Sequence, residues 1–460
     1  MSYVRAVCCV LLASALAGPV SAQDVEPIRI TLHPAAPAGP ALRHRLLPAL
    51  HEMAPGNAAD LYKQAIAEMK KDRPAAAGGA DLGDVDDLLD LPPAELPRDK
   101  ARKLLDRYRE VFRLADRAAR SESCDWGITE RIRKMGVNVV LAEVHDMRAL
   151  ARLLALRARL DVLEGRTDRA VRDLQTGFAA ARHVGDNPTL ICSLVGLALT
   201  AITTKELDLL LAQEKAPGLY WALADLPRPF IDLRKAMEGE RLFLYGTFPG
   251  LLEAVNNPDA PPLRPEQIKP GVKLLAEELS VGKDYPTRAA VSLLIRAKHN
   301  AAKEALAAAG YPRTQVDKMP RMEVALLHAT LQYDRLFDEA LKWQTFPYPQ
   351  ARKGMEQAER EARQARAKVL SPAGDVPALP LATLFLPAVQ KVFAARARID
   401  RRFAALRCVE AVRLYAAAHG GKLPPTLSAI TEVPVPSDPY LGKPFAYRVR
   451  SGVATLEGPP

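Results

Sequence analysis

Residues 151–184 read ARLLALRARLDVLEGRTDRAVRDLQTGFAAARHV, and this stretch has the clearest helical pattern of the chain. Its apolar residues recur every three or four positions on both sides of Gly165, which is typical of amphipathic helices. Gly165 permits a tight turn between them. Ala170 and Gly177 are small enough for the two helices to approach closely, and Leu174 fills the seam. The stretch therefore predicts a helical hairpin.

The same periodicity extends to both sides of this hairpin. Apolar residues share one helix face at Leu104, Tyr108, Val111 and Phe112, and again at Ile128, Ile132, Met135 and Val139. The second of these helices is expected to run to about Leu163. Further helices are expected over 59–71, 167–184, 188–213, 229–256, 286–309, 320–345 and 351–369, separated by Pro and Gly. An aromatic content of 6% also favours helices over sheets, so the chain is predicted to be mainly α.

Composition shifts along the chain predict five segments. Residues 1–22 form a signal peptide, and 23–98 form a Pro- and Ala-rich arm and loop with one short helix. Residues 99–257 form a helical domain, and 258–371 form a second helical region. Residues 372–460 form a long helix with a small β-hairpin module. The aspartates of 81–90 lack the spacing of a calcium loop, so 74–97 is interpreted as a solvated acidic loop.

The hairpin resembles a single tetratricopeptide repeat. The family requires a glycine at the turn and mostly small residues where the helices touch. Those positions are Gly165 at the turn, the small residues Ala158, Ala170 and Gly177, and the larger Leu174. It departs from that pattern at Arg157, where the family prefers an apolar residue, and at Arg182, where proline is usual. A second copy at a 34-residue period is absent, and repeat arrays need about three units. The resemblance therefore implies one repeat-like hairpin in a helical body.

The N-terminus has the pattern of a cleavable signal peptide. Arg5 precedes an apolar run over 6–17, and Val20-Ser21-Ala22 fits a cleavage site. The run is shorter than the ~20 residues that span a bilayer, which argues against an uncleaved anchor. Residues 190–202 are apolar but short, and are interpreted as a buried core helix. The mature protein is expected to begin at Gln23, to be secreted or periplasmic, and to have no transmembrane anchor.

Net charge limits the classes of binding partner, and cysteine content limits the possible disulfides. The net charge is +10, which suits an anionic surface or polysaccharide, or is simply a solvated charged surface. Export argues against nucleic acid. Cleavage near Ala22 leaves Cys124, Cys192 and Cys408, which allow at most one disulfide or are buried small side chains.

The C-terminal segment combines a long basic helix with strand signals. An apolar stripe runs along the helix at Val392, Ile399, Phe403 and Leu406. The helix stops at Gly420-Gly421, and Leu423-Pro424-Pro425 and a 438–444 turn, DPYLGKP, follow. Residues 445–449 and 453–456 are β-prone and are separated by Ser451-Gly452, which predicts a hairpin.

This order resembles the soluble region of type II secretion pseudopilins and related pilin-like secreted proteins, over 381–460. The resemblance implies a pilin-like α+β module. The segment departs from the family pattern in two ways: the helices before the module are not the hydrophobic N-terminal helix used for fibre assembly, and the last residues are not the acidic loop that binds calcium. The basic helix could meet an anionic partner through Arg396, Arg398, Arg401 and Arg402, or be a solvated face with its apolar stripe on the main body.

Motifs for chemistry are weak. The sequence has no Gly-rich phosphate loop, no Gly-x-Ser-x-Gly elbow and no histidine pair at helical ligand spacing, so no cofactor and no metal are predicted. One possible polar site comprises Arg234, Glu238 and Glu240, although an Arg234–Glu238 ion pair along the helix explains the first two. His145 and Arg148 mark another possible polar position.

These observations favour an exported, non-catalytic protein of the bacterial envelope or exterior, acting as a helical interaction or assembly module with protein partners. The alternative is an extracytoplasmic hydrolase whose site is assembled from distant residues, with Glu238 or Glu240 as the acid.

Overall fold

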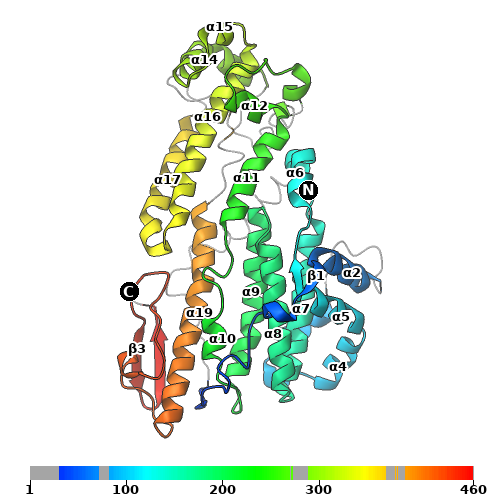
Figure 1. The fold of residues 1–460 in the computed structure, drawn as a ribbon, viewed down its shortest axis with the longest axis vertical. Coiled ribbons are helices and arrows are strands. Elements are labelled where there is room, and N and C mark those ends of the chain that lie inside the picture. The colour runs from blue at the N-terminus through cyan, green and yellow to red at the C-terminus, as the bar shows by residue number, and fades with distance from the viewer. Residues whose placement is uncertain are drawn as a thin grey trace. The chain divides into compact units, whose positions relative to one another are not determined.

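The computed structural model describes residues 31–71, 82–269, 271–272, 288–368, 379, 381 and 389–458 (Figure 1). The chain is mainly helical, at 66% helix against 5% strand, which confirms the predicted fold class. The signal peptide, Gly78-Gly79 and the 372–378 part of the expected boundary lie outside the described residues.

The chain divides into two compact units, and it enters each of them more than once. The first unit contains Gly127–Val140 and Met237–Lys391. The second unit contains Leu141–Ala236, Val392–Pro460 and the residues before Gly127 from Ala17 onward.

The core of the second unit is built on α7 (Ala142–Leu163), α8 (Thr167–Gly185) and α9 (Leu190–Leu211), which pack against one another. The turn between α7 and α8 is at Gly165, whose φ of 71° favours glycine. Around this core lie α2 (Ala58–Lys70), α4 (Arg98–Asp106), α5 (Arg109–Ala118) and α10 (Tyr220–Ala224). A short parallel pairing of β1 (Ala54–Asn57) with β2 (Ser121–Ser123), which the sequence did not predict, ties the N-terminal arm to the end of α5.

Small residues bring α8 and α9 unusually close. A Cβ atom added at Gly196 of α9 would lie 2.6 Å from Gly185 Cα and 2.7 Å from the Ala181 carbonyl oxygen. One added at Gly177 would lie 2.7 Å from Thr203 Oγ1. Gly177 therefore faces α9. The expectation that this glycine allows the close approach of α7 and α8 is wrong. Both sides of α8 are covered by helices, so its small residues are divided between two contacts.

Helix α9 is buried despite its length. Among the described residues it is the one helix long and apolar enough to cross a membrane, and 72% of its apolar window is buried inside the protein. The hydroxyl groups of Thr200, Thr203 and Thr204 donate to backbone carbonyls four residues earlier, which satisfies them without a partner helix. Its burial agrees with the predicted core helix.

Three expected elements differ in the structure. The helix expected over 128–163 is divided into α6 (Ile128–Met135), the 3₁₀ turn η3 (Gly136–Asn138) and α7. Gly136 causes the break, because its φ is 53° and a Cβ there would lie 2.9 Å from Thr247 Cα. The face expected over 104–112 is split between α4 and α5. Part of the expected acidic loop is the helix α3 (Gly83–Asp90), which buries Val85 and Leu88.

The first unit is built from paired helices. It contains α12 (Leu251–Asn256), α14 (Arg288–Ala308), α15 (Arg313–Val316), α16 (Arg321–Leu341), η4 (Lys342–Thr345) and α17 (Tyr348–Lys368), with most of α11 (Arg234–Thr247). The helix expected over 229–256 is thus two helices, separated at Gly250, whose φ is 85°. α14 packs along α16, and Tyr311 fixes the end of α12 by donating to the Ala254 carbonyl at 2.8 Å.

The C-terminal part of the second unit is α19 (Val389–Ala418), the turn η5 (Leu427–Ala429) and the antiparallel hairpin of β3 (Ala446–Arg450) and β4 (Val453–Glu457) (Figure 1). Ser451 and Gly452 have φ of 49° and 77°, as a two-residue hairpin turn requires, which confirms the predicted hairpin. Tyr447 and Leu456, which pair across the strands, pack on apolar clusters of α19.

Candidate functional site

The residues predicted on α11 do not form one site. Arg234 has a 73% exposed side chain and pairs with Asp232, with its Nε 2.8 Å from Asp232 Oδ2, in place of the expected Glu238. Glu238 is exposed, whereas Glu240 is 4% exposed. Because residues two apart on a helix do not face each other, the two carboxylates have different environments.

A polar cluster instead joins α11 to α16 in the first unit. Tyr245 Oη donates to Asp334 Oδ2 at 2.6 Å, and Arg241 Nε lies 3.7 Å from Asp334 Oδ1. Arg241 also pairs with Asp338, and its guanidinium lies 4.7 Å from the centre of the Phe337 ring. We call Arg241, Tyr245, Asp334 and Asp338 the α11–α16 cluster. The sequence signal was the pair of aspartates four residues apart, which became meaningful only once α16 lay beside α11.

Burial dominates the electrostatics of this cluster. It raises the pKa of Asp334 above its ordinary value, although the Tyr245 hydrogen bond and the Arg241 charge oppose the shift. Burial, the hydrogen bond and the charge of Asp334 also raise the pKa of Tyr245. A carboxyl group that keeps its proton can act as a general acid. The bonds that Asp334 makes here hold two helices together, which is a structural role.

His145 and Arg148 do not converge on α7. His145 is exposed, and Arg148 is half-buried, where burial and then Arg152 lower its guanidinium pKa. The polar contact of this segment is made by the buried residue between them. Asp146 Oδ2 lies 2.5 Å from Lys70 Nζ of α2. The sequence pattern indicated the correct helix, but the residue that makes the polar contact is Asp146.

The basic positions of α19 are largely occupied within the second unit. Arg396 is 8% exposed, with its guanidinium 4.7 Å from the Phe393 ring centre, and Arg402 pairs with Asp208 of α9. Arg401 Nε lies 2.9 Å from Asp438 Oδ2. Arg398 is exposed. A sequence shows that a helix is basic, but the neighbours that pack on several of its sides decide which charges remain at the surface.

Asp438 anchors the 438–444 turn of the C-terminal segment. Its side chain is fully buried, and its Oδ1 accepts the Tyr440 backbone N–H at 2.8 Å. Its backbone N–H donates to the Lys443 carbonyl at 2.8 Å, and Gly442 N–H donates to its carbonyl at 2.7 Å. The Arg401 guanidinium supplies the positive charge that this buried carboxylate needs. The turn is thereby fixed to α19.

Arg157, which departs from the repeat pattern, is the centre of a buried ion network. Its Nη2 lies 2.8 Å from a carboxylate oxygen of both Asp116 and Asp173, and its guanidinium stacks on Phe112. Burial raises the pKa of Asp173 to about 8. The nearby negative charges of Asp161 and Asp116 add to this shift, and the positive charge of Arg157 opposes it. A polar residue stands at this apolar position because its partners come from two other helices.

The cysteines are not activated. Cys124, Cys192 and Cys408 are free thiols, and burial raises the pKa of Cys124 and Cys408 to about 12. Burial, and then Arg182, lowers the pKa of His183 to about 4. At neutral pH these thiols are protonated and the imidazole is uncharged. That is the reverse of a thiolate–imidazolium pair.

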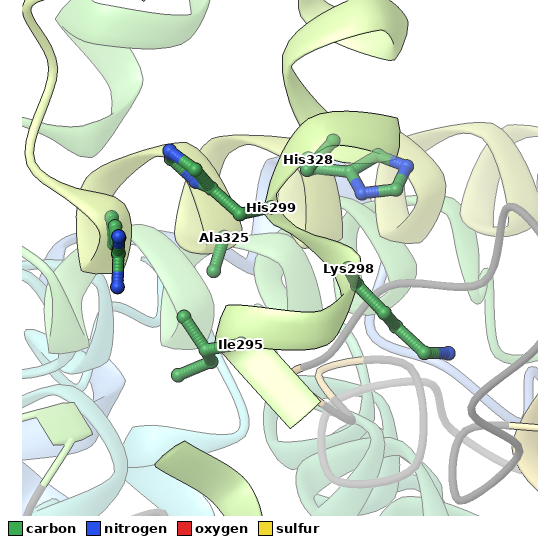
Figure 2. Close-up of a pocket in the computed structure, with 7 residues that line it drawn as sticks. Ile295, Lys298, His299, Ala325 and His328 are labelled. Carbon is green, nitrogen blue, oxygen red and sulfur yellow. The ribbon is translucent and has the colours of Figure 1, made fainter. Parts of the chain in front are cut away.

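A small hollow lies between α14 and α16 in the first unit (Figure 2). Its lining comprises Ile295, Lys298, His299, Ala302, Arg321, Ala325 and His328. Figure 2 shows that Lys298 and His299 leave α14 in opposite directions. Basic and imidazole side chains border the hollow, and no carboxylate does. No sequence motif predicted this hollow, because its residues come from two helices whose register is set by packing.

Within the described ranges, no three His, Cys, Asp or Glu residues are grouped to hold a metal ion. The comparisons with known proteins found no match to a family model, to a curated protein or to a solved structure.

Proposed function

We propose that this chain is an exported, non-catalytic protein of the bacterial envelope or exterior, and that its C-terminal module, residues 389–458, is an interaction surface. The signal-peptide pattern of residues 1–22 supports export. A pilin-like module and a tetratricopeptide-like hairpin remain our interpretations of 381–460 and 151–184. Both structural types commonly serve protein interaction.

The outer face of the β3–β4 hairpin carries this proposal. Alternation along the strands places Tyr447 and Leu456 toward α19, so Arg448 and Arg450 lie on the opposite face with Val453. Both arginines are exposed, and Val453 is 65% exposed. In the described part of the chain each strand has a single partner, which leaves backbone groups at the sheet edges. An acidic, extended segment of a protein partner fits such a surface by strand addition.

The state of the titratable groups supports a non-catalytic role. The α11–α16 cluster holds its carboxylates in bonds to Tyr245 and Arg241, and the thiols of Cys124 and Cys408 are protonated at neutral pH. Carboxylates held in such bonds stabilise the fold, and protonated thiols are poor nucleophiles.

Cross-linking in cells, followed by mass spectrometry of the tagged full-length protein, tests the interaction. R448E/R450E reverses the charge of the outer face, and R98E/K100E makes the same charge change on exposed positions of α4. We expect a stoichiometric protein partner that R448E/R450E loses and R98E/K100E keeps. A partner retained equally by both variants, or no partner with a free monomeric protein, would refute the proposal.

Export has its own test. The N-terminal peptide of the protein from cells is expected to begin at Gln23, and A22R is expected to leave the precursor uncleaved because cleavage requires a small residue there. Finding the intact N-terminus on wild-type protein in the cytoplasm would contradict export.

A hydrolase is the second candidate, favoured by one observation. Glu240 is buried on α11, and Asp334 on the facing helix α16 has a raised pKa. A screen with chromogenic glycosides and esters would support it if the activity vanished in E240Q and D334N and persisted in E238Q. No turnover by the wild-type protein would remove it.

A further inference from the structure

An imidazole and a guanidinium lie together at the mouth of the α14–α16 hollow. His299 comes from the middle of α14, and Arg321 is the first residue of α16. Both line the same hollow, whose apolar sides are Ile295, Ala302 and Ala325. The hollow itself is too narrow to enclose a water molecule, and the roughly 200 Å³ of empty space around it includes open solvent. A ligand would therefore place a small chemical group at the mouth of the hollow and would not enter it.

The charged groups that act on His299 are positive, and one of them, Arg321, has no counter-charge among the described residues. Burial, and then Lys303 and Arg321, lowers the pKa of His299. Lys303 has a counter-charge, because its Nζ lies 2.9 Å from Asp317. The described residues give Arg321 no ion-pair partner, and its side chain is exposed. Lys303 and Arg321 therefore both act on His299, and Asp317 neutralises only Lys303.

The nearest acid in α16 faces elsewhere. Glu323 is 1% exposed, and its Oε1 accepts the Leu263 backbone N–H at 2.8 Å. The helix itself adds positive potential, because the N-cap residue Pro320 provides no side-chain cap for the first N–H groups of this 21-residue helix.

We propose that His299 and Arg321 bind an oxyanion, a phosphate or sulfate group, at the mouth of this hollow. The guanidinium offers a planar pair of N–H donors to such a group, and the imidazole adds one donor and, when protonated, one charge. The bound anion supplies the counter-charge that the protein does not. The site is independent of the C-terminal module and of the interaction proposed for it.

Histidine-resolved NMR of the full-length protein tests the site with inorganic phosphate. At constant ionic strength, phosphate is expected to raise the pKa of His299, because an adjacent anion favours the imidazolium. R321Q should reduce this shift, and equilibrium dialysis should show phosphate affinity reduced about tenfold in both H299Q and R321Q. R335Q is the matched control, an exposed arginine of α16 roughly 20 Å along the helix from Arg321.

The pH dependence gives a second readout. Binding of sulfate, whose charge is constant in this range, should weaken as the pH rises through the pKa of His299, because the imidazolium loses its charge, and H299Q should remove this dependence. Vesicles containing phosphatidylglycerol identify the source of the anion. Retention on vesicles that depends on Arg321, without phosphate binding, would assign the group to a lipid head group. If neither probe moves the His299 resonance or distinguishes R321Q from R335Q, the proposal is wrong.

Discussion

Arg413 and Glu410 form an ion pair inside the second unit, with Nη1 2.5 Å from Oε1 and neither side chain exposed to solvent. The same guanidinium donates to the carbonyl oxygens of His33 at 2.9 Å and Ala216 at 2.8 Å, and Glu410 accepts the Leu219 backbone N–H. One pair on α19 therefore holds both the N-terminal arm and the segment before α10.

Removing one partner of this pair should be strongly destabilising. R413M leaves Glu410 buried without its cation, so we expect a loss of about 3–5 kcal/mol in the free energy of unfolding. R45M breaks an exposed pair with Asp225 and should cost less than about 1 kcal/mol. Urea unfolding followed by circular dichroism gives both values, and equal losses in the two variants would contradict this account.

The α8–α9 contact predicts a sharp effect of one methyl group. G196A would place Cβ 2.6 Å from a backbone atom of Gly185, which cannot move aside as a side chain can, so we expect a loss of about 1–3 kcal/mol. G83A on α3 meets no atom within 4 Å and should be neutral. Thermal unfolding distinguishes them, and a G196A protein as stable as G83A would show that the helices lie further apart.

Stability should depend on pH through Asp173. Its folded-state pKa of about 8 lies above the ordinary value of 3.8, so the folded protein binds the proton more tightly. The stabilisation is complete below the unfolded pKa and is lost as the pH rises through the folded one. The free energy of unfolding should therefore fall between about pH 4 and pH 8. D173N removes this proton, and its difference from wild type should change over that interval; a constant difference would count against a raised pKa.

Asp438 should control the order of the C-terminal hairpin. D438A leaves Arg401 without its buried partner and frees the Tyr440 N–H, so hydrogen exchange is expected to accelerate over 438–457. Exchange in α7 and α8 should stay at the wild-type rate. E432A, which changes an acid on the same module outside this turn, is the control. Unchanged protection of β3 in D438A would disprove the anchoring role.

The thiols should be slow to alkylate in the folded protein. Burial raises the pKa of Cys124 and Cys408 to about 12, so little thiolate is present at pH 8. Iodoacetamide is expected to label them at least tenfold more slowly in buffer than in urea, as quantified by peptide mass spectrometry. Rapid labelling of Cys408 in buffer would mean that the contact between α19 and the hairpin opens readily.

Periodicity and glycine positions were enough to predict the helical class, the turn at Gly165, the core helix α9 and the hairpin at Ser451-Gly452. These features are local, because periodicity and a glycine at positive φ act within a few residues. The break at Gly136 was missed because the sequence does not show that the backbone of Thr247 packs against this glycine. The α3 helix was missed because eight residues with several acids give a weak periodic signal.

The partners of the charged residues, in contrast, depend on how the helices pack. Arg157, Arg401 and Arg413 look alike in the sequence, yet each pairs with a different carboxylate. Arg157 pairs with Asp116 of α5, Arg401 with Asp438 of the 438–444 turn, and Arg413 with Glu410 of its own helix. The pairing of His299 with Arg321 likewise depends on the register of α14 against α16. A buried charge is stable only where packing supplies its partner, and that choice is made by contacts between residues far apart in the chain.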